Sequence, residues 1–402
     1  MATKLSNRCR LIKPSPTLSL SAKAKEMKDA GIDVISFSVG EPDFPTPDYI
    51  KNAAHKAIDA NYTRYTNNAG ILELRQAICD KLLRDNDLKY SPKEILVSPG
   101  AKASIVNALT AVCDVKDQVL MGAPYWVSYP YQVALANAEP IYIPTKEEDG
   151  YKIQAAELEI AIQENPCTKA LILNSPGNPT GAVYTKEELA ALAEICIKYD
   201  ILVISDEIYE RLVYDDVKHI SIASISEEMK QRTIVINGVS KAYAMTGWRL
   251  GYAAGPANII ATAGKVQEHS TSCVNSITQY ACVTALNEED DSIEKMRQEF
   301  SVRRDFLYNE LKKIPHISCF KPQGAFYIMP GIKWYLDNNN QNIQTSDDFC
   351  AKLLDKYSVA LVPGSSFGME GTVRFSYANS MENIKEGISR FASFLQELNP
   401  GR

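Results

Sequence analysis

The sequence predicts an α/β protein whose mainly parallel sheet is covered by helices on both faces. Four short runs, at residues 95–98, 170–173, 201–204 and 233–236, are apolar without alternation. Strands with no polar face are typical of parallel sheets that are buried on both sides. The stretches between the runs contain helical patterns, and this alternation of strand and helix indicates the same class.

Two of these helices have recognisable starts. A turn at Gly100 after the first run precedes a helix that begins near Ala101. After the second run, Thr185 and Glu188 have the spacing of a capping box. The helix that follows has one apolar face, formed by Leu189, Leu192, Ala193 and Cys196.

The C-terminal part has a different pattern. Strand-like pieces at residues 324–329, 359–363 and 373–377 precede a helix with an apolar face of Ile384, Ile388, Phe391 and Leu395. This pattern favours a smaller α+β unit joined by the N-terminal arm. We therefore expect a large domain at residues 48–289 and a small domain at residues 1–47 and 290–402.

Composition excludes several classes of function. The 402 residues carry a net charge of −6 and are 45% hydrophobic, which gives no reason to expect nucleic acid or a membrane as partner. The N-terminus lacks a signal-peptide pattern, and no stretch of about 18 apolar residues occurs. Nine cysteines without a CxxC pair, and no HExxH, predict free thiols and no metal site. The protein is expected to be cytoplasmic.

Polar residues at the ends of the strands are the candidate functional residues, because ligands in such folds bind beyond the carboxyl ends of strands. Lys241 follows one strand and could form a Schiff base with a carbonyl cofactor. Arg249, eight residues on, offers a planar set of donors to a phosphate. Asp206 follows another strand and could keep a pyridine nitrogen protonated. A solvated Lys–Arg pair and a turn-capping Asp206 are the structural alternatives.

Two further loops can be interpreted in the same way. The turn at residues 174–181 is rich in Asn, Pro and Gly, and Asn178 in it could donate a hydrogen bond to a phenolate oxygen. Residues 100–102 open a helix whose free N–H groups suit a phosphate. Either segment could equally be an ordinary loop.

Together, these elements resemble the class I aminotransferases of pyridoxal-phosphate (PLP) fold type I. The branch that contains bacterial aspartate and aspartate/prephenate aminotransferases is the most similar, from about Lys13 to about Leu395. This fold type implies a seven-stranded, mainly parallel sheet in a large PLP-binding domain, with a smaller α+β domain. The resemblance is carried by Val39-Gly40-Glu41-Pro42-Asp43-Phe44, Pro124-Tyr125-Trp126-Val127-Ser128-Tyr129, Asn178-Pro179-Thr180-Gly181, Asp206-Glu207-Ile208-Tyr209, Ser240-Lys241-Ala242, Gly247-Trp248-Arg249 and Arg374-Phe375-Ser376.

The resemblance implies a role for each residue around the cofactor ring. Lys241 would hold PLP covalently and then act as general acid and base. Asp206 would pair with the ring nitrogen, and Trp126 would stack on the ring. Asn178 and Tyr209 would donate hydrogen bonds to its phenolate oxygen.

The resemblance also implies a phosphate site and a carboxylate site. The phosphate would be held by Arg249, Ser240 and the N–H groups of Gly100, Ala101 and Lys102. Gly238 stands where relatives often have Ser. Arg374 would bind the substrate α-carboxylate, with the backbone around Gly40 closing over it and with Trp126 and Asn178 facing the substrate. Tyr65 matches a tyrosine that reaches the phosphate of a neighbouring subunit, which implies a homodimer.

Substrate choice depends on three residues, Lys13, Thr17 and Lys102. They match positions that contact the distal carboxylate of a dicarboxylic substrate in the aspartate/prephenate branch. A buried carboxylate is costly unless it is paired, so such a site selects acids. Lys13 as a solvated arm residue and Lys102 as a phosphate neighbour are the alternatives.

The resulting hypothesis is ping-pong transamination between L-aspartate or L-glutamate and 2-oxoglutarate or oxaloacetate, with prephenate as a further candidate. An aromatic, alanine or kynurenine-type aminotransferase, or a PLP lyase, would share Lys241, Asp206 and Arg374. A non-catalytic regulator with an aminotransferase-like domain is a third alternative. The presence of Lys241 and the lack of an added domain disfavour it.

Overall fold

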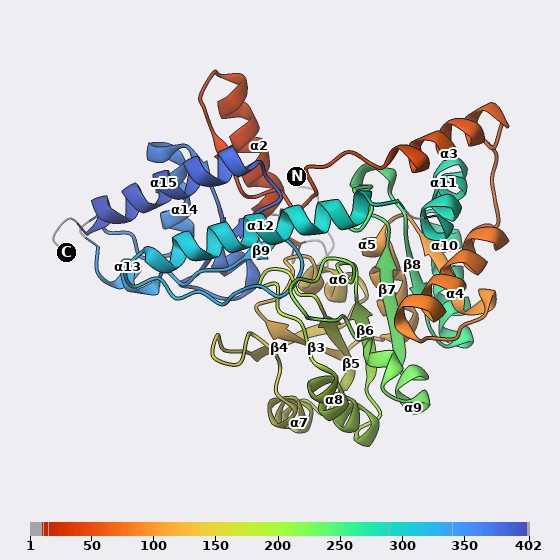
Figure 1. Ribbon diagram of the computed structural model, residues 1–402. Helices are drawn as coiled ribbons and strands as arrows, with labels where there is room; N and C mark the ends of the chain where they lie inside the picture. Colours follow the sequence, from red (N-terminus) through yellow and green to blue (C-terminus); the bar gives the residue numbers. More distant parts are fainter. Residues whose placement is uncertain (1–9, 11, 15, 289, 340, 400–402) are drawn as a thin grey trace, which may run out of the picture.

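A seven-stranded sheet forms the centre of the larger part of the molecule (Figure 1). The computed structural model describes residues 10, 12–14, 16–288, 290–339 and 341–399. The strand order is β2-β8-β7-β6-β5-β3-β4. The strands are β2 (Ile95–Ser98), β3 (Gln118–Ala123), β4 (Glu139–Pro144), β5 (Thr168–Asn174), β6 (Leu202–Asp206), β7 (Thr233–Gly238) and β8 (Gly251–Ala254).

The predicted mainly parallel sheet is confirmed, with one antiparallel strand. β3, β4, β5, β6 and β7 pair in parallel, whereas β8 runs antiparallel to both β7 and β2. The four strands expected from apolar runs are present as β2, β5, β6 and β7. Strands β3, β4 and β8 were not predicted from the apolar runs. β4 contains Pro140 and Pro144 and lies at the edge of the sheet, where missing N–H donors are tolerated.

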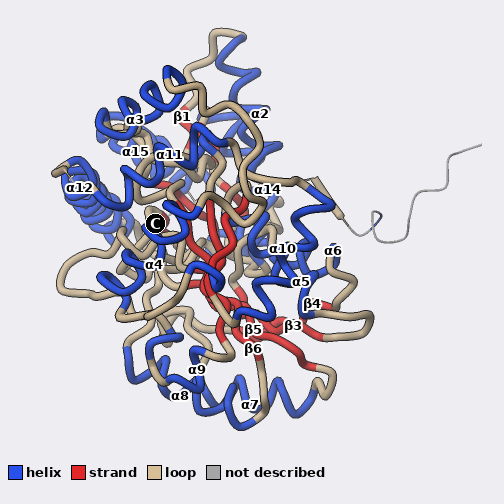
Figure 2. The backbone as a smooth tube through the Cα atoms, turned by 90° about the vertical axis from the view of Figure 1, so that its right-hand side faces the viewer, coloured by secondary structure: helices blue, strands red, loops and turns tan. Residues whose placement is uncertain are grey.

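Helices cover both faces of this sheet, as expected from strands without a polar side (Figure 2). Because side chains alternate along a strand, neighbours such as Leu96 and Val97 enter different cores. One face packs against α5 (Ala101–Val112), α6 (Tyr129–Leu135) and α10 (Ala257–Ser270). The other face packs against α3 (Asp48–Asp59), α4 (Leu72–Asn86), α7 (Ala155–Glu164), α8 (Lys186–Lys198) and α11 (Ser276–Asn287), and the short α9 (Glu227–Lys230) adjoins it.

The capping box predicted for α8 is confirmed. The Thr185 side chain accepts a hydrogen bond from the Glu188 N–H, and the Glu188 carboxylate accepts one from the Thr185 N–H. The four residues of its predicted apolar face are all buried in one core. The capping box therefore marks where α8 begins, and the apolar face determines which side of the helix packs against the sheet.

The smaller part of the molecule combines both ends of the chain. In it, β1 (Ile35–Ser36) pairs with β10 (Val359–Ala360), and β11 (Val362–Pro363), β12 (Val373–Ser376) and β9 (Tyr327–Ile328) form a three-stranded sheet. The long helix α12 (Ser292–Lys313) leads from the larger part into this smaller one (Figure 1). The other helices are α2 (Pro16–Asp29), α13 (Lys333–Asp337), α14 (Ser346–Tyr357) and α15 (Met381–Leu398).

The apolar face predicted for the last helix is confirmed. Ile384, Ile388, Phe391 and Leu395 of α15 are buried in one core together with Phe37 and Phe375. Over the described ranges, no helix is both long enough and apolar enough to cross a membrane.

Two helical glycines provide a test of this packing. A Cβ on Gly387 in α15 would lie 2.3 Å from a ring carbon of the buried Phe37, whereas a Cβ on Gly264 in α10 would meet its nearest atom at 4.0 Å. We expect Gly387→Ala to lower the free energy of unfolding by about 1–3 kcal/mol, because a packed aromatic ring must shift. Gly264→Ala should raise it by roughly 0.5–1 kcal/mol through helix propensity alone. Thermal unfolding followed by circular dichroism checks both, and a stabilised Gly387→Ala variant would contradict the packing argument.

Candidate active site

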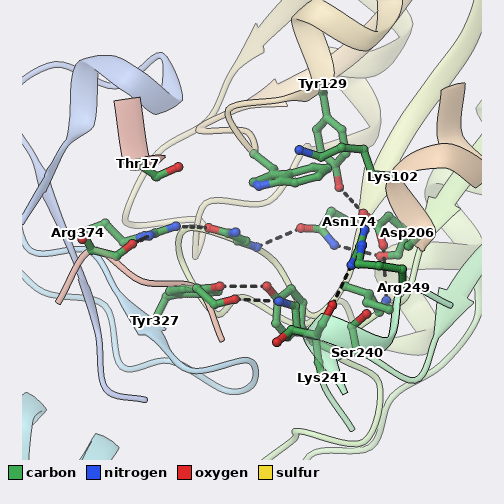
Figure 3. Close-up of a pocket in the computed structure, with 18 residues that line it drawn as sticks. Thr17, Lys102, Tyr129, Asn174, Asp206, Ser240, Lys241, Arg249, Tyr327 and Arg374 are labelled. Carbon is green, nitrogen blue, oxygen red and sulfur yellow. Dashed lines mark hydrogen bonds between the residues drawn. The ribbon is translucent and has the colours of Figure 1, made fainter. Parts of the chain in front are cut away.

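A pocket of about 290 Å³ lies at the carboxyl ends of β5, β6 and β7 (Figure 3). Asn174 and Asp206 end two of these strands, and Ser240 and Lys241 follow the third. The opposite wall comes from the smaller part of the molecule, from α2, the segment after β1, β9 and β12. The residues that form this wall are Thr17, Ser38, Gly40, Tyr327 and Arg374.

Lys241 presents a nucleophilic amine to the pocket. Its Nζ donates a hydrogen bond to the Gly40 carbonyl oxygen at 2.6 Å. Burial lowers the pKa of this amine to about 8, with help from the cations of Arg249 and Arg374, while the Glu41 and Asp206 carboxylates oppose the shift. A large share of Lys241 is therefore neutral, and able to attack a carbonyl, at a pH where an ordinary lysine is protonated.

Asp206 is a buried carboxylate whose pKa is set by opposing effects. The Tyr129 hydroxyl donates to its Oδ2 at 2.7 Å, and the Ile208 N–H donates to its Oδ1 at 3.3 Å. Burial raises the pKa of Asp206 to about 6, although both hydrogen bonds and the Lys241 amine oppose the rise. The side chain thus caps the following turn and also faces the pocket, so the two interpretations of this residue are compatible.

Arg374 is a buried cation that has no carboxylate partner among the described residues. Its Nη1 donates to Asn178 Oδ1 at 3.0 Å and its Nη2 to the Ser38 carbonyl oxygen at 2.8 Å, while Nε has no partner. The guanidinium lies between the rings of Tyr327 and Phe367, at 4.4 and 4.9 Å. Burial lowers its pKa. Because an unpaired buried charge is costly, this geometry suits an incoming carboxylate.

The N-terminus of α5 and Arg249 form a cradle for an anion. Helix α5 begins at Ala101, directly after Gly100, which has a φ of 87°. A Cβ on Gly100 would lie 2.4 Å from Arg249 Nη2, and a Cβ on Gly251 would lie 2.2 Å from the Ala101 nitrogen. Ser240 is buried at the same wall of the pocket. Free helix N–H groups beside a guanidinium fit a phosphate, and glycine keeps the space open for it.

Gly238 has a packing reason to be glycine. It ends β7 opposite Gly251 of β8, and a Cβ on it would lie 2.8 Å from the Gly251 Cα and from the Leu250 carbonyl oxygen. In this chain the position therefore serves the close approach of two strands.

Aromatic rings and one further lysine line the rest of the pocket. Trp126 packs edge-on against Tyr129, with ring centroids 5.3 Å apart. The Lys102 Nζ lies 5.0 Å from the Trp126 ring, and burial together with Arg249 lowers its pKa. The Tyr209 hydroxyl forms a 2.8 Å hydrogen bond with the Tyr327 hydroxyl.

The structure brings most of the predicted site residues together. Those that line the pocket are Thr17, Gly40, Ala101, Lys102, Trp126, Asn178, Asp206, Tyr209, Ser240, Lys241, Arg249 and Arg374. Gly100 adjoins it through Arg249. Lys13 is exposed and does not line the pocket, and Tyr65 lies outside it with 93% of its side chain exposed.

Six residues of the pocket were not predicted: Ser38, Tyr129, Asn174, Ile208, Thr246 and Tyr327. Tyr129 stands in the Pro124–Tyr129 motif, and Asn174 opens the Asn/Pro/Gly-rich turn, so both had a signal in the sequence. Tyr327 lies in the strand-like piece predicted at residues 324–329, but nothing indicated that it belongs to the site, because its partner Tyr209 is 118 positions away.

Comparison with known protein families identifies the class of this fold and site. The family model described as aminotransferase class I and II matches residues 32–391. The chain belongs to this family, whose members depend on PLP.

Individual relatives in this family include aspartate, aspartate/prephenate and aromatic aminotransferases. The chain is 45% identical to an aspartate aminotransferase of Bacillus subtilis, over 98% of this chain and 99% of that protein. It is also 45% identical to an aspartate/prephenate aminotransferase of Nitrosomonas europaea, over 98% and 100% of the two chains. Among solved structures, an aspartate aminotransferase of Rhizobium meliloti superposes with a TM-score of 0.95 at 40% identity, over 99% and 100%. An aromatic aminotransferase of Pyrococcus horikoshii gives 0.87 at 41%, over 93% and 99%.

The lowered pKa of Lys241 predicts that this amine reacts with aldehydes at a lower pH than an ordinary lysine does. In the cofactor-free protein, labelling of Lys241 by a small aldehyde and a reductant should rise with pH and be half-maximal near pH 8, because only the neutral amine reacts. Peptide mass spectrometry at a series of pH values measures this. Glu41→Gln removes a carboxylate that favours the charged amine and should move the midpoint to lower pH. A midpoint near 10.5, the ordinary lysine value, would contradict the argument.

Proposed function

We propose that this protein is a PLP-dependent aminotransferase that moves an amino group between L-aspartate or L-glutamate and a 2-oxo acid by a ping-pong mechanism. The observation that carries the proposal is one pocket holding a reactive amine, Lys241, and a buried unpaired guanidinium, Arg374. Full-length relatives named as aspartate and aspartate/prephenate aminotransferases support the choice of substrate, with prephenate as a further candidate.

The residues present fit PLP. The anion cradle of α5 and Arg249 suits the phosphate, and glycines keep it open. Asp206 is ionised above about pH 6 and would pair with the ring nitrogen. Trp126 would cover the ring, and Asn178 and Tyr209 would donate to its phenolate oxygen. When bound, PLP withdraws electrons from the substrate and so makes its Cα–H bond acidic.

Lys241 performs two tasks in this proposal. Its amine, neutral at a lower pH than an ordinary lysine, first holds the cofactor covalently. Once the amino acid has displaced it, the amine would take the proton from the substrate Cα as a general base and deliver it to the C4′ carbon of the cofactor as a general acid.

Arg374 and its neighbours bind and orient the substrate. The α-carboxylate would pair with the guanidinium and occupy the unpaired Nε. The Gly40 loop, whose carbonyl accepts a hydrogen bond from Lys241, belongs to the same wall and would help to exclude water from a bound substrate. Orientation by such a pair places the Cα near Lys241, which supplies much of the rate enhancement.

Lys102 and Thr17 support the choice of a dicarboxylic substrate. Both line the pocket, and Lys102 lies above the Trp126 ring, where a second carboxylate would reach it. Lys13 is exposed in this structure, so a contribution from it would require the N-terminal segment to move closer.

We further propose that the active unit is a homodimer. Tyr65 is 93% exposed, and Tyr62 near it is 44% exposed, which is unusual for large aromatic side chains. Burial against a second copy would explain this exposure and would bring Tyr65 to the partner's phosphate site.

The proposal predicts a specific reaction. With PLP, L-aspartate and 2-oxoglutarate, the protein should form oxaloacetate, measured by a coupled dehydrogenase assay. Lys241→Ala should reduce turnover by at least about 10³-fold, because both the covalent and the proton-transfer tasks are lost. PLP should still bind to this variant through the phosphate cradle and Asp206, as dialysis would show. Substantial transamination by Lys241→Ala would refute the assignment of this lysine, and absence of oxaloacetate would refute the aspartate activity.

Lys102 provides a test of substrate choice. Lys102→Met keeps the apolar stem over Trp126 and removes the charge. We expect kcat/KM for aspartate and glutamate to fall roughly tenfold or more, with a smaller loss for phenylalanine and alanine, because only the acidic donors lose a paired carboxylate. Lys313→Met on the exposed end of α12 is the matched control. Equal losses across donors would mean that Lys102 serves the phosphate, and a preference for phenylalanine in the unmodified protein would favour an aromatic aminotransferase.

A further inference from the structure

Two phenols meet behind the predicted cofactor site. Tyr209 follows β6 of the large sheet, and Tyr327 lies in β9 of the small sheet. Their hydroxyl oxygens are 2.8 Å apart and their rings are nearly perpendicular, at 84°. Both side chains are buried, so this hydrogen bond connects the two parts of the molecule away from water.

The direction of this hydrogen bond decides what Tyr209 can do. Each neutral phenol has a single proton, and one of the two must be used between them. If Tyr209 donates to Tyr327, the Tyr209 hydroxyl has no proton left to donate to a group in the pocket. If Tyr327 donates to Tyr209, the Tyr209 proton remains available to an acceptor in the pocket.

The surroundings favour Tyr327 as the donor. The Arg374 guanidinium lies 4.4 Å from the centre of the Tyr327 ring and stabilises negative charge on that phenol. Burial raises the pKa of both phenols, and the Arg374 cation opposes the rise for both; the pKa of Tyr209 is raised well above its ordinary value, and that of Tyr327 is raised less. The more acidic phenol of a pair is the better hydrogen-bond donor, and that is Tyr327.

We propose that Tyr327 is a positioning residue with two contacts: its hydroxyl donates to Tyr209 and so directs the Tyr209 proton to the cofactor's phenolate oxygen, and its ring supports Arg374. The inference rests on the proposed PLP-dependent function. Tyr327 itself also closes the wall at Gly40, because a Cβ on Gly40 would lie 2.7 Å from its hydroxyl oxygen.

The test is the pH midpoint of the visible absorption change of the PLP-loaded protein. Tyr327→Phe should raise this midpoint by roughly half a pH unit, about threefold in proton affinity, which is the scale of one neutral hydrogen bond. The reason is that a weaker hydrogen bond to the phenolate leaves the proton shared with the Lys241 nitrogen more tightly held. Tyr209→Phe should raise it further. The double variant should match Tyr209→Phe alone, because Tyr327 acts through Tyr209.

Two further variants separate this role from a structural one. Tyr335→Phe also deletes a buried hydroxyl of the smaller part, one that donates to the Pro315 carbonyl oxygen at 2.8 Å outside the pocket, and it should leave the midpoint unchanged. Tyr327→Leu removes the ring and should weaken succinate binding roughly tenfold through Arg374, whereas Tyr327→Phe should bind succinate normally.

The possible outcomes are distinct. An unchanged midpoint in Tyr327→Phe, or a double variant that exceeds Tyr209→Phe, overturns the role of Tyr327. A protein that shows no visible band with PLP contradicts the cofactor proposal instead. If Tyr327→Leu does not fold, the result for Tyr327→Phe still decides the role of the hydroxyl.

Discussion

A buried guanidinium that has no carboxylate partner within the described part of the chain is the constraint on which the site depends. Arg374 is held by the Asn178 side chain and the Ser38 carbonyl, and by two aromatic faces. These contacts are weak substitutes for an ion pair, so the charge remains available to a ligand. Asn178 comes from the large sheet and Arg374 from the small one, so the same interaction fixes the two parts of the molecule against each other and shapes the pocket between them.

The pKa values of Lys241 and Asp206 are shifted by burial and by the charged groups around the pocket. Arg374 and Arg249 oppose a proton on Lys241, and burial acts in the same direction, so the pKa of the amine falls to about 8. For the Asp206 carboxyl, burial and the neighbouring Glu207 carboxylate raise the pKa to about 6, against the Tyr129 hydroxyl, the Ile208 N–H and the Lys241 amine. Because the pKa of Lys241 is lowered, its neutral form predominates above about pH 8. Because the pKa of Asp206 is raised, its ionised form is lost below about pH 6. Both groups therefore have the form that the proposed chemistry needs near and above pH 8.

The sequence was sufficient for features that depend on local pattern. Lys241, Asp206 and Asn178 could be found because buried strands are readable from apolar runs and because ligands collect where such strands end. Strand β4 was missed because an edge strand with two prolines lacks that pattern. Tyr327 and the Arg374–Asn178 contact depend on packing between segments that lie more than a hundred positions apart, which no local pattern encodes. Lys13 matched a family position and is exposed in this structure, so its role in substrate binding stays a prediction.

Two consecutive buried carboxylates, Asp206 and Glu207, stand at the end of strand β6. Glu207 follows Asp206 directly, just beyond the end of β6, and its carboxylate is buried. There it accepts hydrogen bonds from the Ser205 and Ser221 hydroxyls and contacts His219 at 3.0 Å, so its lone pairs are satisfied without any group from the pocket. Beyond it, Glu210 pairs with the buried Lys81. These partners compensate the neighbouring carboxylates. Of the three, it is Asp206 that lines the pocket, where the Tyr129 hydroxyl and the Ile208 N–H donate to it.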